Sequence, residues 1–162
     1  EAAGLTNVVF CRANGAELGA LPPRADVLVA LHACGGLSDV ALALAASASA
    51  SALICTCCFN KHRALCPASS WSMSEDNKDT LCRMADCEST AVSFPARHAL
   101  SCVRLREFAR KLEALPATRH PVLSIRTFPD IYSKQNFVLV ADVEPAHRTD
   151  STGGAFSPSS SW

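Results

Sequence analysis

Residues 26–59 read DVLVALHACGGLSDVALALAASASASALICTCCF, and this stretch decides the fold. Residues 26–32 are almost continuously apolar, which is typical of a parallel strand that is buried on both faces. The alanine- and leucine-rich residues 39–48 predict a helix, and residues 52–59 predict the next buried strand. The stretch therefore predicts a strand–helix–strand unit with a right-handed crossover.

Further elements flank this unit along the chain. A short apolar run at residues 7–12 predicts a strand before it, and the polar residues 60–73 indicate a surface excursion after it. The remaining expected elements are a helix from Ser74 to residue 87, a break at Phe94-Pro95, a helix over residues 96–115, and strands over residues 122–128 and 136–143. The short loop between the last two strands favours an antiparallel return. This alternation of strands and helices predicts an α/β fold with a layered sheet.

The composition bounds the class of protein. The chain has 162 residues, enough for one domain, and 49% of them are hydrophobic, which can fill a core. Lys and Arg number 15 and Asp and Glu number 15, so the net charge gives no general support for nucleic acid as a partner. No apolar run approaches the length of a membrane span, so no membrane partner is expected. We expect a domain over residues 1–145 and a low-complexity, disordered tail over residues 146–162.

The cysteines and the first residues indicate the compartment. The chain has 9 cysteines, an odd number, whereas a secreted disulfide scaffold prefers an even one. Residues 1–10 show no signal peptide. A reducing, cytoplasmic setting follows, with most cysteines acting as small buried hydrophobic residues. The first residue is Glu1 and not Met, so the chain is expected to be processed or a piece of something longer.

Histidine, cysteine and glycine residues lie where the expected strands end. Ligands of open α/β sheets bind at the carboxyl ends of the strands. Residues 32–35 (His-Ala-Cys-Gly) follow the first strand of the unit, and glycine lets a backbone approach a ligand closely. Asp39 is expected in the first turn of the next helix, behind a Ser38 cap, where it could hydrogen-bond a ligand. A tight strand-to-helix turn with a capped helix explains the same residues equally well.

A second group of cysteines ends the next strand. Cys55 and Cys58 have CxxC spacing, and zinc takes four ligands from thiolates and imidazoles. Strand alternation places Cys55 and Cys57 on one face and Cys58 on the other, which argues against a shared metal. The other candidate ligands are His32, Cys34 and His62. Core or pocket wall is the favoured interpretation, and structural zinc and redox thiol chemistry stay open.

Polar and basic residues near the same edge could bind a nucleotide. Asn14 carries an amide that could meet an adenine edge, although an Asn-Gly turn explains it as well. Lys61 and His62 follow the second group of cysteines and could contact phosphates. A run of basic residues over 97–111 could do the same. A solvated helix face is the favoured interpretation of that run.

The motif LHACG at residues 31–35, then SDVAL at 38–42 and CCFNK at 57–61, resembles class I S-adenosylmethionine-dependent methyltransferases. The resemblance is to the methyltransferase-like 25 type, and more distantly to tRNA 2′-O-methyltransferases. It implies a Rossmann-like sheet of order 3-2-1-4-5-7-6, in which residues 7–12 are strand three and residues 26–32 are strand four. Residues 52–58 then form strand five, and the last two strands are six and seven.

The resemblance also implies roles for individual residues. His32 is the expected general base, because imidazole suits proton transfer near neutral pH. S-adenosylmethionine is the implied cofactor, and RNA is the implied acceptor; no metal is obligatory and no protein partner can be named. The implied cofactor-binding residues are Asn14, His32, Ala33, Cys34 and Gly35. The implied substrate-binding residues are Asp39, Cys57, Cys58, Asn60 and Lys61.

Two features of the family's pattern are absent from the sequence. These are the glycine-rich turn after strand one and the acidic residue after strand two. The chain is therefore expected to hold strands three to seven without strands one and two, and to be a poor enzyme by itself. The alternatives are a non-catalytic binding or scaffold module on the same fold, and a small zinc protein.

Overall fold

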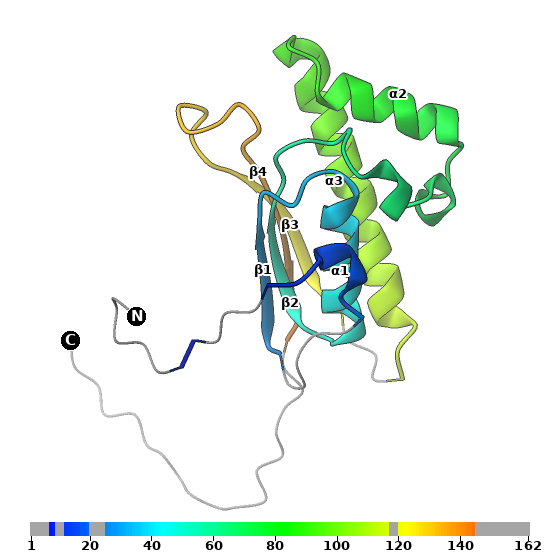
Figure 1. The fold of residues 1–162 in the computed structure, drawn as a ribbon, viewed down its shortest axis with the longest axis vertical. Helices are drawn as coiled ribbons and strands as arrows, with labels where there is room; N and C mark the ends of the chain where they lie inside the picture. The colour runs from blue at the N-terminus through cyan, green and yellow to red at the C-terminus, as the bar shows by residue number, and fades with distance from the viewer. Residues whose placement is uncertain (1–6, 9–11, 20–24, 117–119, 145–162) are drawn as a thin grey trace, which may run out of the picture.

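The computed structural model describes residues 7–8, 12–19, 25–116 and 120–144 (Figure 1). It contains four strands, three α-helices and three short 3₁₀ turns. In chain order these are η1 (Gly15–Glu17), β1 (Val27–Leu31), α1 (Gly36–Ser47), β2 (Ser51–Cys55), η2 (Arg63–Leu65), η3 (Ala68–Trp71), α2 (Glu75–Ala85), α3 (Thr90–Glu113), β3 (Val122–Thr127) and β4 (Phe137–Asp142).

The four strands form one sheet of order β1-β2-β4-β3. β1 and β2 are parallel and are joined by α1, so the predicted strand–helix–strand unit is confirmed. β4 is antiparallel to both of its neighbours, and the predicted antiparallel return between the last two strands is also confirmed. The mixed α/β class is therefore correct, and the sheet is consistent with part of a Rossmann-like methyltransferase fold.

Helices α1 and α3 cover one face of this sheet (Figure 1). Ile54 of β2 and Leu139 of β4 are fully buried beneath them, against Phe108 and Leu112 of α3. A second cluster, built around Phe59, Trp71, Cys82 and Leu100, joins α2 to the first half of α3. This second cluster lies past the edge at which β1 and β2 end, so it supports the loops that follow those strands.

No described helix covers the opposite face of the sheet, and several of its apolar side chains are exposed. Val27, Val29 and Leu31 are 57%, 59% and 73% exposed, and Leu53 of β2 is 40% exposed. The prediction that residues 26–32 are buried on both faces is therefore wrong. The side chains of a strand alternate between faces, and only the alternate residues of β1 reach the layer of helices.

Several predicted boundaries also differ from the structure. Helix α1 starts at Gly36 with Gly35 at its N-cap, and the Ser38 hydroxyl donates to the Ala33 carbonyl instead of capping the helix. Helix α3 runs through Pro95 without the expected break. Pro95 removes the hydrogen bond to the carbonyl of Ala91, which lies in the exposed first turn where water can replace it.

Some predictions fall partly outside the described residues. Of the strand expected over residues 7–12, Asn7, Val8 and Arg12 are described and none is in a strand, and the other three lie outside the description. The expected tail over residues 146–162 lies wholly outside it, so the division into domain and tail stays a prediction. Among the described helices, none combines the length and the hydropathy needed to cross a lipid bilayer.

Candidate functional site

Two loops meet at the edge of the sheet where β1 and β2 end. The amide of Gly35 donates to the carbonyl of Cys58 over 2.8 Å, and the amide of Gly36 donates to the carbonyl of Lys61 over 3.2 Å. Because parallel strands end at the same edge, the sequence predicted this meeting. We call residues 32–36 the first loop and residues 56–62 the second loop.

The two glycines allow the loops to touch backbone to backbone. A Cβ atom on Gly35 would lie 1.6 Å from the Lys61 carbonyl oxygen, and one on Gly36 would lie 2.2 Å from that of His62. Gly35 also has a φ of 51°, in the left-handed region that glycine adopts without strain. No other residue fits at either position while the second loop stays in place.

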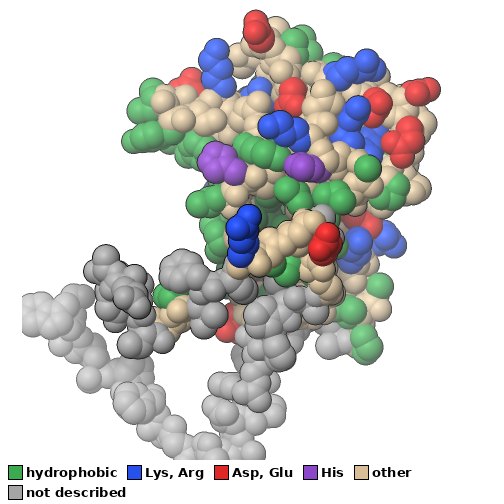
Figure 2. Space-filling model, in the orientation of Figure 1, with side chains coloured by type: hydrophobic (Ala, Val, Ile, Leu, Met, Phe, Trp, Pro, Cys, Tyr) green, Lys and Arg blue, Asp and Glu red, His purple; other side chains and the backbone are tan. Residues whose placement is uncertain are grey.

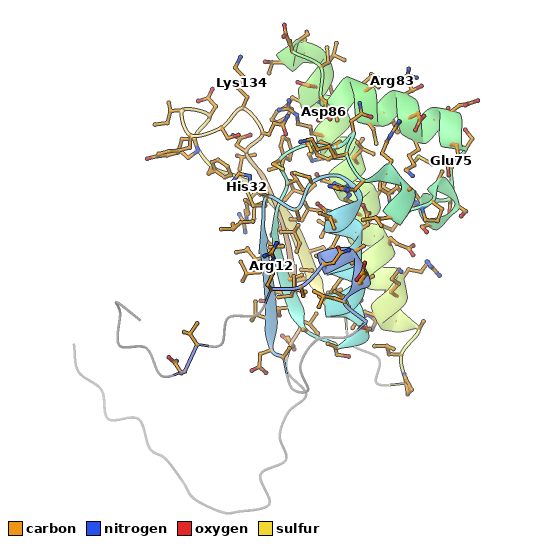
Figure 3. The ribbon with its side chains drawn as sticks, in the orientation of Figure 1. Arg12, His32, Glu75, Arg83, Asp86 and Lys134 are labelled. Carbon is orange, nitrogen blue, oxygen red and sulfur yellow. The ribbon has the colours of Figure 1, made fainter. Side chains whose placement is uncertain are left out.

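His32 sits at the turn from β1 into the first loop (Figure 3). Its φ is 54°, a left-handed conformation that histidine, asparagine and aspartate adopt more often than other side-chain-bearing residues. Its imidazole is exposed, as is that of His62 in the second loop, and Figure 2 shows histidine side chains at the surface beside hydrophobic ones. The backbone thus presents the imidazole of His32 to solvent at the edge of the sheet.

Three cysteines from the two loops lie together. The sulfur atoms of Cys34, Cys57 and Cys58 all lie within 4.8 Å of one another, and Cys34 and Cys57 are 2.6 Å apart. The predicted alternation of Cys57 and Cys58 is wrong, because β2 ends at Cys55 and both residues lie in the loop beyond it. Burial and the neighbouring Cys34 thiol raise the pKa of Cys57 to about 12, and burial also raises the pKa of Cys58.

Asp39 is held by Arg104 and Trp71. Both carboxylate oxygens accept from the Arg104 guanidinium at 3.0–3.3 Å, and one accepts from the Trp71 indole at 3.1 Å. Arg104 is 1% exposed, donates to the Gly35 carbonyl over 2.8 Å, and lies over the rings of Phe59 and Trp71. Asp39 therefore positions the Arg104 guanidinium that holds the Gly35 carbonyl of the first loop. The expected contact of Asp39 with substrate stays a prediction.

Arg104 belongs to the basic run over residues 97–111, and its position in the helical pattern already indicated burial. Arg104 lies four residues from both Leu100 and Phe108, on the buried face of α3. Arg97, one heptad earlier, is buried as well, and it donates to the carbonyls of Ala85 and Lys134 over 2.7 and 2.6 Å. For Arg97 and Arg104 both interpretations of the basic run, phosphate contact and a solvated helix face, are wrong, because both side chains bind protein groups inside the fold.

Asp86, at the C-terminus of α2, orders the second loop. Its carboxylate accepts from the amide of Phe59 at 3.0 and 3.1 Å and from the amide of Asn60 at 2.9 Å. The side chains of Asn60 and Lys61 are exposed just beyond this point. Sequence reasoning did not single out Asp86, since nothing local distinguishes it from the other acidic residues of α2.

Replacing Asp86 with alanine should loosen the second loop. The amides of Phe59 and Asn60 would lose a charged acceptor, a loss of about 1–3 kcal/mol of stability. Hydrogen exchange followed by NMR should show faster exchange at these two amides. Glu88→Ala, an exposed acidic residue two positions away, should leave both amides unchanged. Equal exchange rates in the two variants would show that Asp86 does not hold the loop.

Asn14 stands apart from the two loops. It precedes η1, and its amide donates to the Glu17 carboxylate over 2.7 Å. The neighbouring Gly15 faces Leu37, at the start of α1. The structure thus brings together Ala33, Cys34, Gly35, Cys57 and Cys58, with His32, Asn60 and Lys61 on the same loops, whereas Asn14 is on a separate segment.

A large cavity lies between the α2–α3 junction and the β3–β4 loop. Its volume is about 970 Å³, and Asp86, Phe94, Arg97, Phe128 and Asn136 are among the residues that line it. Asp86 belongs both to this cavity and to the contacts of the second loop. A ligand in the cavity would therefore lie next to the edge of the sheet.

Comparison with known protein families gives a match in the first part of the chain. The family model described as a methyltransferase domain matches residues 4–64. The matched segment includes β1, α1, β2 and both loops. Neither the curated proteins nor the solved structures contain a significant match to the chain.

Proposed function

We propose that the chain is part of a methyltransferase domain that uses S-adenosylmethionine to methylate RNA. The observation that carries the proposal is the family match over residues 4–64, which spans the two loops. That match supports a transferase over a non-catalytic module on the same fold. The relationship to the methyltransferase-like 25 type, or to tRNA 2′-O-methyltransferases, is part of the proposal.

The topology of the sheet supports this assignment. In the sheet that the resemblance implies, the last four strands have the spatial order 4-5-7-6. Strand seven therefore lies between strands five and six. The sheet of this chain has the order β1-β2-β4-β3, with β4 antiparallel between β2 and β3. We therefore assign β1 and β2 to strands four and five, so that the two loops lie at the methyl-transfer end of the sheet.

The first loop offers the cofactor a wall beside the edge of the sheet. Ala33 is buried and Cys34 is partly buried, so this wall consists of hydrocarbon and sulfur. His32, Ala33, Cys34 and Gly35 would hold the cofactor there, and Asn14 would contact its adenine. When bound, S-adenosylmethionine supplies an electrophilic methyl group.

The chain's own residues would orient the acceptor and remove its proton. His32 presents an exposed imidazole that can take up the proton of an acceptor hydroxyl near neutral pH. The contacts from Asp39, Arg104 and Asp86 fix the loops on which His32, Cys58 and Asn60 lie. Positioning of this kind accounts for much of the catalysis expected of such a site.

The cavity beside the second loop favours a nucleotide as the acceptor. Phe94 and Phe128 offer aromatic surface for stacking. The Asn136 amide nitrogen already donates to the Phe128 carbonyl, so its side-chain oxygen is the group that would accept from a base edge. Lys61 and Lys134 are exposed near this edge and could meet phosphates. RNA recognition commonly uses this combination of aromatic stacking and basic groups.

Replacing His32 with asparagine should remove the base and keep the backbone, because asparagine also tolerates the left-handed conformation. Methyl transfer to RNA by the full-length protein should fall about 10²–10⁴-fold. Binding of S-adenosylmethionine, measured by calorimetry, should change little. His62→Asn, at the other exposed left-handed histidine, is the matched control and should keep the wild-type rate.

Three results would each count against a part of the proposal. An unchanged rate in His32→Asn would remove His32 from the catalytic role. A full-length protein that binds no S-adenosylmethionine would overturn methyl transfer as the function. Transfer to protein but not to RNA would overturn only the acceptor.

A further inference from the structure

Cys34, Cys57 and Cys58 form a group of possible metal ligands at the edge of the sheet. Their sulfur atoms lie within 4.8 Å of one another, and all three side chains are partly buried. Among the described residues, no other set of three or more histidine, cysteine or acidic side chains lies close enough to share a metal ion. The group joins two segments that are more than 20 residues apart in the chain.

The backbone fixes this arrangement. The hydrogen bond from Gly35 to the Cys58 carbonyl holds the residue after Cys34 against the residue after Cys57. Because the second loop has left the strand, Cys57 and Cys58 both turn toward Cys34. Arg104 and Asp86 hold the two loops in place through the Gly35 carbonyl and the Phe59 amide. The three thiols are thus brought together before any ion arrives.

The spacing suits a thiophilic metal ion. Zinc–sulfur bonds of about 2.3 Å in a tetrahedral site place two thiolates about 3.8 Å apart. The three sulfur atoms lie within 4.8 Å of one another, so rotation of the cysteine side chains brings them to that separation. Cys34 and Cys57, at 2.6 Å, would move apart as the ion enters between them.

We propose that Cys34, Cys57 and Cys58 bind one zinc ion through three thiolates, with the fourth position open at the edge of the sheet. Each thiol releases its proton as its sulfur–zinc bond forms, so binding of one ion releases three protons. Three protein ligands and one open position are typical of zinc sites that bind a water or a substrate.

Zinc binding can be tested on the whole chain, reduced and handled without oxygen. Zinc content after dialysis should be one ion per chain, and cobalt substituted for zinc should give a sulfur-to-cobalt charge-transfer band. Cys34→Ser, Cys57→Ser and Cys58→Ser should each weaken zinc binding by more than about tenfold, the lower range for losing even an outer partner of a metal site. The matched control is Cys55→Ser, which alters the same segment outside the group and should bind normally.

A second measurement does not depend on folding of the variants. In the wild-type chain, zinc should protect Cys34, Cys57 and Cys58 from alkylation, and should leave the exposed Cys102 reactive, as read by mass spectrometry. Loss of binding in Cys55→Ser with normal binding in Cys34→Ser would overturn the proposal in favour of a CxxC site.

Two further outcomes would also overturn it. The first is reduced protein that takes up no zinc. The second is reduced protein in which zinc protects none of the three thiols. These readouts do not involve methyl transfer, so the zinc site and the proposed function succeed or fail separately.

Discussion

Gly35→Ala is expected to destabilise the protein by about 3–5 kcal/mol, combining left-handed strain with the loss of two loop hydrogen bonds. The added Cβ would lie 1.6 Å from the Lys61 carbonyl oxygen, so one loop must move away from the other. Chemical or thermal unfolding measures the loss directly. Movement of the loops would also separate Cys34 from Cys57 and Cys58.

Gly19→Ala is the matched control for this substitution. Gly19 has no heavy atom within 4 Å of the position that its Cβ would take. The variant should therefore unfold at the wild-type midpoint. If Gly35→Ala were as stable as Gly19→Ala, the backbone contact between the two loops would not exist in solution.

Arg104→Met is expected to cost about 3–5 kcal/mol, the range for removing one partner of a buried ion pair. Methionine fills a similar volume, but Asp39 would keep a partly buried charge without the guanidinium that now balances it. The Gly35 carbonyl would lose its donor as well. Denaturant unfolding should show the change as a lower midpoint.

Two further variants test whether the loss of stability in Arg104→Met comes from its interaction with Asp39. Arg110→Met, on the exposed part of the same helix, removes the pair with Glu107 and should leave stability unchanged. The double variant Arg104→Met with Asp39→Asn should recover part of the lost stability, because it removes the orphaned carboxylate. A double variant as unstable as the sum of the single ones would show that the two side chains do not interact.

The sequence was sufficient to predict the strand–helix–strand unit and the antiparallel last strands. Apolar runs, glycines and prolines mark these elements locally, and pairing rules then fix their neighbours. The sequence could not predict the bare face of β1. Both of its faces are apolar, since Leu28 points to the helices while Val27 and Val29 point away, and apolar composition does not tell which face is covered.

The candidate site was predictable where it depends on strand ends and not where it depends on distant contacts. The contact of Cys34 with the second loop could be predicted, because the carboxyl ends of two neighbouring parallel strands lie at the same edge of the sheet. The orientation of Cys58 did not, because it depends on β2 ending at Cys55 rather than a few residues later. The roles of Arg104 and Asp86 depend on partners far away in the chain, which periodicity does not reveal.

The order of strands in the sheet also has a consequence for synthesis on the ribosome. β1, α1 and β2 are contiguous in the chain, so they can assemble as soon as residue 55 has emerged. The other edge of β2 pairs with β4, where Ile54 lies opposite Leu139, and β4 is the last of the described strands to be made. Until β4 has emerged, the nascent chain therefore carries β2 with one edge unpaired, a stage at which edge-to-edge pairing with other chains competes with folding.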